Sequence, residues 1–444
     1  MKFSIEILGP IKKADIELGD LTIICGKNST GKTYITYSLI AFFSYIRHCQ
    51  FMFIIDDNDT KEIKAKGEVS LDVKEYKERF REIIEEKDNY FNDTYLSSLL
   101  AIKHKQEQLT WKLPEDFINN DPYIITRNIT ATCDLKATWN KNQKKIKFQL
   151  TNRGEGYPTD ETIEMGISTI LNNFFKEKFI SETEFTSFTC ERTGVALFGN
   201  DLIAADFIKK TDKDSYKKVV PNEPSFYQMP IRKEIMNNID FSYLYTDSFI
   251  TQKHPQILEC FEDIVKGKYV YDDTIKQMMF IPEGTTDIKL TMHQSSSTVR
   301  SLKSFDFFLR HQIQPHQTIV MDEPELNLHP ENQRKLARLF AMLVNIGIKV
   351  IITTHSDYII REFNALIMLK NDRPILKKIQ ESEGYTDSEL LNSSSVKVYS
   401  TVQQNDGVVL EVAPVSQKDG ITINTLDDVI NKMNQIHEAI YWGE

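Results

Sequence analysis

Residues 21–33 read LTIICGKNSTGKT, a run of strand-forming residues that leads directly into a glycine-rich loop. The loop, GKNSTGKT at 26–33, fits the phosphate-binding pattern G-x-x-x-x-G-K-[ST] in full. Its glycines let the backbone wrap around a phosphate, and an apolar helix predicted over residues 34–46 directs its positive end at the same group. We therefore predict a nucleotide site in which Lys32 reaches the β- and γ-phosphates and the Thr33 hydroxyl ligates Mg²⁺. The loop consists of Gly26, Lys27, Asn28, Ser29, Thr30, Gly31, Lys32 and Thr33.

A second predicted strand ends in two adjacent carboxylates, within the stretch TIVMDEPELNLHPE at 318–331. Two charges at the end of a buried strand are costly unless a metal ion or a positive partner neutralises them. With the glycine-rich loop upstream, we predict that Asp322 holds Mg²⁺ and that Glu323 is the general base for an attacking water. A solvated strand end is the alternative.

A lone histidine follows the next predicted strand. A helix is expected from about Pro330 to Val344, and Lys349-Val350-Ile351-Ile352-Thr353 reads as another buried strand that leads into Thr354-His355-Ser356. A single histidine at a strand end is usually structural. Because this one lies on the strand that follows Asp322, we predict instead that His355 senses the γ-phosphate.

Three serines open another predicted helix, in HQSSSTVRSL at 293–302. Ser295, Ser296 and Ser297 supply hydroxyls and free N–H groups at a helix start, which is an anion site. Taken alone, the same serines would be no more than a helix cap.

The order of these elements resembles the ABC-type ATPases of the SMC/RecF/OLD group, over roughly residues 1–45 and 275–365. By that resemblance four residues correspond to the Walker A lysine, the Walker B aspartate, the catalytic glutamate and the switch histidine: Lys32, Asp322, Glu323 and His355. Residues 295–297 fall on the family's signature motif and residues 327–330 on its D-loop. The resemblance implies a head-to-head dimer with two ATP molecules between the lobes, and leaves higher homo-oligomers open.

Two positions depart from the family pattern. Ser297 stands where the signature has a glycine, which implies a looser approach of the backbone to phosphate. His329 replaces the aspartate of transporter D-loops, as in the OLD-like branch. A further segment, FTCERTG at 188–194, resembles a strand end of OLD-like ATPases. Arg192 would then approach the nucleotide or the dimer contact, with an ordinary surface arginine as the alternative.

The predicted fold class is α/β: an ABC-type P-loop ATPase head, a mixed sheet flanked by helices, with a large α+β arm inserted between Walker A and the signature. We expect the head to comprise residues 1–110, 276–370 and 371–444, and the arm residues 111–275, from which a strand near 185–194 returns to the head. Within the arm, residues 131–152 read as a β-hairpin with a turn near Asn140, and residues 195–275 as a helical arm broken by loops. The hairpin's lysines would contact nucleic acid or form a solvated edge: Lys141, Lys144, Lys145 and Lys147.

The composition limits the classes of protein to which the chain could belong. An apolar content of 41% supports folded cores, and a net charge of −10 argues against a general nucleic-acid-coating protein. The five cysteines are far apart, and no pair has metal-site or redox-motif spacing. We expect reduced thiols, a cytoplasmic location and no membrane segment.

The compact layout resembles the ATPase subunits of prokaryotic anti-phage systems such as PARIS and Septu, and of retron-linked modules. That resemblance implies an ATP- and Mg²⁺-dependent sensor or scaffold that controls a separate effector encoded nearby, such as a nuclease or toxin. The tail lacks a DxD pair, so we expect no nuclease activity in cis. The main alternative is a RecF-like repair ATPase stimulated by DNA; a P-loop kinase would leave Glu323, the serines and His355 without roles.

Overall fold

The computed structural model describes residues 1–48, 51–86, 96, 108–112, 122–140, 143–154, 156–180, 185–199, 230–231, 234–235, 246–275 and 277–442. The chain divides into two units. The head unit contains residues 3–41, 92–110 and 185–444, and the arm unit contains residues 1–2, 42–91 and 111–184.

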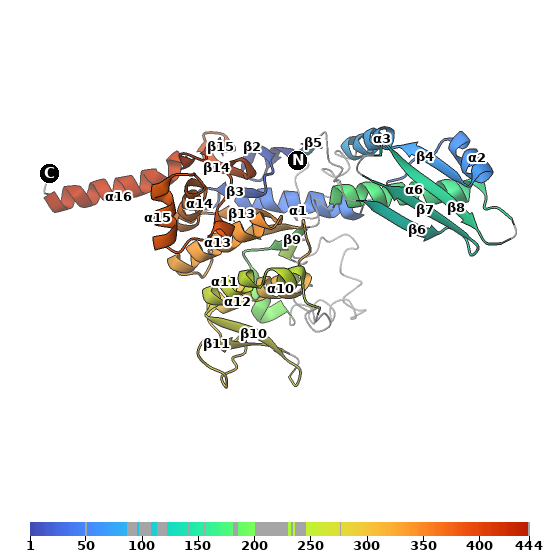
Figure 1. The fold of residues 1–444 in the computed structure, drawn as a ribbon. Coiled ribbons are helices and arrows are strands. Elements are labelled where there is room, and N and C mark those ends of the chain that lie inside the picture. The colour runs from blue at the N-terminus through green and yellow to red at the C-terminus, as the bar shows by residue number, and fades with distance from the viewer. Residues whose placement is uncertain are drawn as a thin grey trace, which may run out of the picture. The chain divides into compact units, whose positions relative to one another are not determined.

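A nine-stranded mixed sheet organises the head unit, in the order β5-β1-β2-β15-β14-β3-β13-β12-β9 (Figure 1). The strand β3 runs parallel to β13 and β14, and β12 runs parallel to β13 and β9. β14 and β15 are antiparallel, which makes the sheet mixed. The strand bounds are β1 Lys2–Leu8, β2 Ile11–Glu17, β3 Leu21–Cys25, β5 Gln108–Lys112, β9 Phe185–Phe188, β12 Thr318–Asp322, β13 Lys349–Thr354, β14 Val396–Gln404 and β15 Gly407–Ala413.

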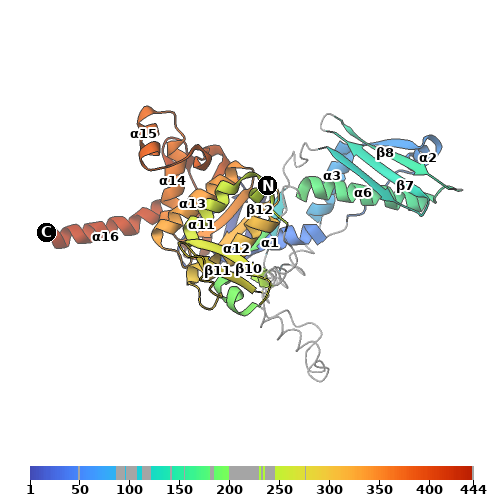
Figure 2. The same cartoon turned by 60° about the horizontal axis from the view of Figure 1, so that its bottom comes forward.

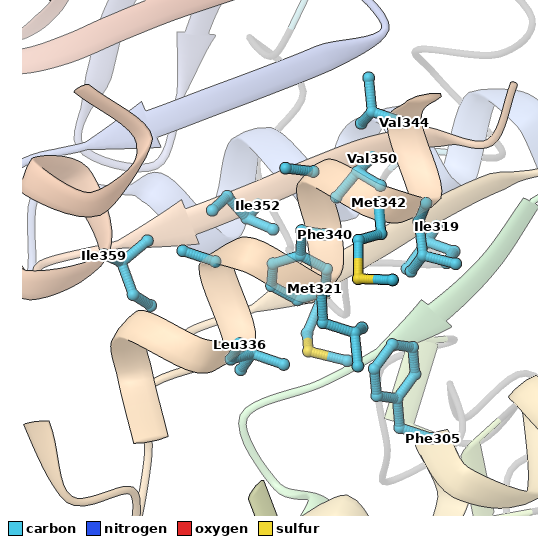
Figure 3. Packing of buried hydrophobic residues seen from close by; sticks show 14 of the residues in the cluster. Phe305, Ile319, Met321, Leu336, Phe340, Met342, Val344, Val350, Ile352 and Ile359 are labelled. Atoms are coloured by element: carbon cyan, nitrogen blue, oxygen red, sulfur yellow. The ribbon is translucent and has the colours of Figure 1, made fainter. Parts of the chain in front are cut away.

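The central strands are buried on both faces, which explains their continuous apolar sequences. Every residue of β3 and β12 is buried, as are all but the first residue of β13. On one face they form a single apolar cluster with helices α11 to α14. In Figure 3, Phe340 and Met342 of α13 lie against Ile319 and Met321 of β12, beside Phe305 of α12. This packing fixes where the strand ends lie.

The helices of the head unit begin and end at recognisable signals. Pro330 occupies the first turn of α13, where its missing N–H costs nothing, and His329 caps that helix. Ser356 caps α14 in the same way. The bounds are α1 Lys32–His48, α10 Phe249–Lys253, α11 Pro255–Val265, α12 Ser297–Phe307, η3 Phe308–Gln312, α13 Pro330–Asn345, α14 Asp357–Leu369, α15 Pro374–Ser382 and α16 Asn424–Trp442.

Smaller elements complete the head unit. Two short hairpins pair β10 Gly267–Asp272 with β11 Gln277–Pro282, and β16 Val415–Ser416 with β17 Gly420–Ile421. The 3-10 turns are η4 Asp387–Glu389 and η5 Ser393–Ser395. Figure 2 shows α16 extending away from the sheet. Ile436 and Ile440 of this helix are exposed. None of the described helices is both long and apolar enough to cross a membrane.

The arm unit contains a four-stranded sheet in the order β4-β8-β7-β6. β7 and β8 form an antiparallel hairpin, as predicted for residues 131–152. Lys147 of this hairpin pairs with Glu68 at 2.7 Å, while Lys141 lies outside the described residues. The bounds are α2 Asp57–Lys66, β4 Glu68–Asp72, α3 Val73–Glu86, β6 Tyr123–Asn128, β7 Cys133–Trp139, β8 Lys145–Asn152 and α6 Asp160–Ile180.

The predicted α/β class, a mixed sheet flanked by helices, is confirmed. The predicted elements around the glycine-rich loop and residues 318–354 are present, with ends shifted by a few residues; the helix predicted over 34–46, for example, is α1, which spans Lys32–His48. The division into 1–110, 111–275, 276–370 and 371–444 stays a prediction. Much of the expected helical arm at 195–275 lies outside the described residues.

Candidate nucleotide site

The loop at 26–33 needs glycine at both ends for steric reasons. Gly26 and Gly31 have φ of 146° and 87°, in the region that side chains disfavour. A Cβ on Gly26 would lie 1.9 Å from the Thr401 hydroxyl oxygen, and one on Gly31 would lie 2.8 Å from side-chain carbons of Pro10 and Ile11. The loop is therefore shaped by its neighbours as well as by its own sequence.

Lys32 lies inside the curve of this loop. Its side chain is buried, at 4% exposure, and Nζ donates to the carbonyl oxygens of Gly26 at 3.1 Å and Lys27 at 2.9 Å. The Thr30 hydroxyl bonds Lys27 O at 2.8 Å and shares a 2.6 Å hydrogen bond with the Thr401 hydroxyl of β14. The loop is thus tied to the sheet with its cation turned inward, as a phosphate cradle requires.

The carboxyl ends of β3, β13 and β12 meet because the strands are adjacent and parallel. Asp322 is 2% exposed there, and the Thr33 hydroxyl donates to its Oδ2 at 2.9 Å. The Thr353 hydroxyl donates to the other oxygen, Oδ1. A carboxylate beside a hydroxyl at the start of the loop helix is the hard oxygen set that Mg²⁺ prefers. The residues present therefore fit a nucleotide with its metal.

Glu323 adopts an unusual backbone conformation. Its φ is +46°, and its N–H donates to the carbonyl oxygen and the hydroxyl of Thr353, at 3.1 and 3.0 Å. A non-glycine residue held in this region is strained, which is typical of functional sites. The strain turns the chain sharply after Asp322, so that the two adjacent carboxylates point to different surroundings.

His355 lies between two glutamates. Its Nδ1 is 3.2 Å from Oε1 of Glu325 and 3.7 Å from Oε1 of Glu323. Glu325 is 5% exposed, and the same Oε1 accepts from the His355 N–H at 2.7 Å and the Thr354 hydroxyl at 2.8 Å. Burial raises the pKa of the Glu325 carboxyl above its ordinary value, against the opposing effect of these hydrogen bonds.

Arg192 is not a surface arginine. It is 1% exposed, and its Nη1 donates to the carbonyl oxygens of Thr189 and Asp322, both at 2.6 Å. Its Nη2 donates to the carbonyl oxygen of Glu323 at 2.9 Å. The surface alternative for this residue is therefore wrong, because β9 pairs beside β12 and buries the arginine against the strained turn.

The predicted serines are not brought to the loop at 26–33 by any hydrogen bond within the described residues. Ser295 is buried and bonds Thr291 O at 2.8 Å, and Ser296 caps α12 by accepting from Val299 N at 3.3 Å. Ser297 is the first residue of that helix. The predicted helix start is confirmed, and its hydroxyls remain apart from the loop of the same chain.

The start of α12 is joined to the Asp322 region through Asn327. The Thr298 hydroxyl donates to Asn327 O at 2.5 Å, and Asn327 Nδ2 donates to the Thr193 hydroxyl at 3.2 Å. Thr193 follows Arg192, which holds the turn at Glu323. The serine segment and the strained turn thus belong to one hydrogen-bonded network.

A pocket of 630 Å³ borders the loop and His355. Its lining comes from the loop, the end of β13, the start of α14 and the end of β14. The residues are Gly26, Lys27, Thr30, Glu325, Gln333, His355, Ser356, Asp357, Tyr358, Thr401, Val402 and Gln403.

Reasoning from the sequence missed several contacts of this site. Thr353 and Glu325 were visible as polar residues at the ends of predicted strands, but no motif assigned them a partner. Thr401 carried no signal, because its contact with Thr30 depends on β14 pairing with β3. The predicted residues Thr33 and Asp322 are brought together, as are Glu323 and His355; their roles stay predictions.

Several solved structures resemble the chain distantly. The SMC head bound to the C-terminal winged-helix domain of ScpA is 11% identical, with 94% of this chain and 98% of that chain covered and a TM-score of 0.37. The SMC head domain from Thermotoga maritima is 10% identical, with 93% and 98% covered and a TM-score of 0.30. The Smc head with an extended coiled coil from Pyrococcus furiosus is 10% identical, with 98% of each chain covered and a TM-score of 0.32. Likenesses this distant carry no part of the functional argument.

Comparison with curated proteins gives no match to this chain. A family model described as AAA ATPase domain matches residues 1–360 of the 444. That match includes the glycine-rich loop, the carboxylates after β12 and His355. The chain therefore belongs to the AAA ATPase domain family and is an ATP-binding ATPase.

Proposed function

We propose that this ATPase hydrolyses ATP with Mg²⁺, closes into a dimer around the nucleotide, and controls a separate effector protein in anti-phage defence. Lys32 would bind the β- and γ-phosphates, and Thr33 and Asp322 would hold Mg²⁺. When bound, the metal offsets the negative charge of the phosphates. Glu323 would take a proton from the attacking water, and His355 would contact the γ-phosphate.

The observation that carries the hydrolytic part is the meeting of three strand ends. The Thr33 hydroxyl lies 2.9 Å from Asp322, and Glu323 occupies a strained turn directly after it. His355 lies 3.7 Å from Glu323. A metal-binding pair next to a carboxylate and a histidine supplies what phosphoryl transfer to water requires.

The proposed dimer is supported by the serine segment. Ser296 is exposed and Ser297 half-buried at the start of α12, and within the described residues neither has a hydrogen bond to the loop of its own chain, which fits a nucleotide held by a second copy. The resemblance to the SMC/RecF/OLD group implies that arrangement. Control of an effector rests on the resemblance to anti-phage ATPase subunits alone.

DNA remains the alternative trigger. The hairpin lysines would bind the DNA, but their positive charge is partly neutralised by an acidic neighbour, since Lys147 pairs with Glu68 at 2.7 Å. A DNA-stimulated ATPase is therefore the second outcome of the test below.

The test uses Glu323→Gln, which should bind ATP, hydrolyse it at least about 100-fold more slowly, and accumulate as a closed dimer. Mass photometry with ATP and Mg²⁺ would measure the assembly, with Glu331→Gln as a control at an exposed carboxylate nearby. Wild-type turnover in Glu323→Gln would contradict the assignment of the base. The same measurement is repeated with the product of the adjacent gene and with short duplex DNA. ATP-dependent capture of that product supports effector control, whereas a shift with DNA alone supports the repair alternative.

A further inference from the structure

Glu325 has no role in the proposed chemistry, yet it is one of the most buried carboxylates of the site. Its Oε1 accepts hydrogen bonds from the His355 N–H at 2.7 Å and the Thr354 hydroxyl at 2.8 Å, and the ring nitrogen Nδ1 of His355 lies 3.2 Å from the same oxygen. Two of these belong to the same histidine, once through its backbone and once through its ring. The carboxylate therefore fixes both the position and the rotation of that residue.

A proton on Nδ1 favours this contact, because a carboxylate only accepts hydrogen bonds. With Nδ1 facing Glu325, Nε2 is the ring nitrogen left for a phosphate. A carboxylate that sets the tautomer and orientation of a functional histidine is a recurrent arrangement in proteins. His355 and Glu325 both line the 630 Å³ pocket beside the loop.

The competing partner for this ring is Glu323. Its Oε1 is 3.7 Å from Nδ1, half an ångström farther than Glu325. A histidine paired with Glu323 would occupy the carboxylate proposed to act on water. Glu325 holds the ring at the shorter distance, and so competes with Glu323 for the same ring nitrogen.

The burial of Glu325 is itself unfavourable. Its second oxygen, Oε2, is buried and has no hydrogen-bond partner within the described residues. A buried carboxylate oxygen without a partner lowers stability. The residue at this position thus carries a structural cost that an apolar side chain would avoid, which fits a functional requirement.

We propose that Glu325 is a positioning residue for hydrolysis: it holds His355 with Nδ1 protonated and closer to Glu325 than to Glu323. This inference rests on the proposed function, in which His355 meets the γ-phosphate and Glu323 acts on water. In this proposal Glu325 itself contacts neither the γ-phosphate nor the attacking water.

The first test is a double-mutant cycle on the full chain. Glu325→Ala should lower kcat about 10- to 100-fold and leave KM for ATP nearly unchanged, because ring orientation matters for turnover more than for nucleotide binding. Glu325→Gln keeps an oxygen acceptor for the ring and should recover part of that loss. In a His355→Ala background, Glu325→Ala should cost nothing further. If the double variant instead shows the sum of the two single losses in kcat, Glu325 does not act through His355 and the proposal is overturned.

A matched control separates positioning from folding. Glu362 is also buried, and its Oε1 likewise lacks a hydrogen-bond partner within the described residues. Glu362→Gln should leave kcat unchanged even if it lowers the melting temperature as much as Glu325→Gln does. An equal fall of kcat in both variants would reduce the role of Glu325 to stability.

The second test needs no turnover. Nitrogen-15 NMR of histidine-labelled protein, with His355→Ala to assign the signal, reports which ring nitrogen carries the proton. We expect an Nδ1-protonated ring in the wild type, and loss of that preference in Glu325→Ala. The same ring signal in both proteins would overturn the proposal, whereas a wild type with the expected ring but no ATP hydrolysis would instead disprove the proposed function.

Discussion

The head unit buries carboxylates in two regions, which differ in the groups that the carboxylates contact. At the strand ends, Asp322 and Glu325 accept hydrogen bonds from hydroxyl and backbone N–H groups. Beside helix α13, Glu362 of α14 and Glu389 of η4 are also buried, but each faces an arginine: Arg334 Nε lies 2.6 Å from Glu362, and Arg338 Nε lies 2.9 Å from Glu389.

The arginines of the second region make further contacts besides these ion pairs. Arg338 also donates to Gly384 O at 2.6 Å and stacks over the ring of Tyr385 at 4.5 Å. These contacts hold a folded surface together, and the negative charge is neutralised within the chain.

The first region lacks such arginine partners. Within the described residues, no lysine or arginine side chain pairs with Asp322, Glu323 or Glu325; the two glutamates lie beside the ring of His355. Arg192, the arginine beside them, donates to main-chain carbonyl oxygens instead. A site that takes up a cation with its nucleotide needs carboxylates that are not already neutralised, and the difference between the two regions fits the proposed metal site.

The largest effect is expected at Asp322. Asp322→Asn should lower Mg²⁺-dependent ATP turnover at least about 100-fold, because a neutral amide is a poor ligand for Mg²⁺. The same change should leave the unfolding free energy equal or slightly higher, since it removes a buried charge that no cation pairs with in the free chain. Steady-state kinetics and urea unfolding measure the two quantities. A large loss of unfolding free energy in Asp322→Asn would contradict the distinction drawn between the two regions.

Arg192→Lys should come next, with kcat lowered about 10- to 100-fold. A lysine cannot reproduce the three hydrogen bonds that the planar guanidinium makes to Thr189, Asp322 and Glu323. The turn that carries the proposed base would then shift. Arg334→Lys is the control, since Arg334 belongs to the second region. Equal kcat losses in the two variants would contradict a specific role for Arg192.

The contrast between the two regions also separates what the sequence could predict from what it could not. The glycine-rich loop and the buried strands around Asp322 and His355 were predictable because local pattern determines them: an apolar run, a glycine loop, a helix start. Their meeting follows from parallel strands whose ends share one edge of a sheet. The α/β class followed from the same pattern.

Contacts that depend on distant pairing were not predictable. Arg192 is 130 positions from Asp322 in sequence and reaches it only because β9 lies beside β12. Glu325 looked like one more charge after a strand, and only the end of β13 buries it. The hairpin of β10 and β11 also escaped prediction, because residues 267–282 mix apolar and charged types without a clear alternating pattern.

The third prediction concerns the structural carboxylates. Glu389→Gln should lower the unfolding free energy by about 2 kcal/mol, because it removes the charge that Arg338 faces and weakens the hydrogen bond from Thr386 N. ATP turnover of the folded protein should not change. Urea unfolding and kinetics on the same preparation measure both. A fall in kcat without loss of stability would place Glu389 among the functional carboxylates.

The smallest effect is expected at Asp306, where burial outweighs an arginine partner. Arg310 Nε lies 2.9 Å from Asp306, yet burial outweighs this partner and raises the pKa of Asp306 from 3.8 to about 6. Because the folded state then takes up the proton first, the contribution of Asp306 to stability is present in full below pH 3.8 and is lost as the pH rises through 6.

Asp306→Asn tests this dependence, because an amide cannot titrate. On going from pH 7 to pH 5, the wild type should gain about 1 kcal/mol of unfolding free energy relative to Asp306→Asn. Urea unfolding of both proteins at the two pH values measures the difference, with Glu389→Gln as a second reference. An equal change in unfolding free energy in the wild type and in Asp306→Asn would mean that Arg310 keeps Asp306 charged at both pH values. Asp306 would then belong with Glu362 and Glu389, the carboxylates that form ion pairs with arginines.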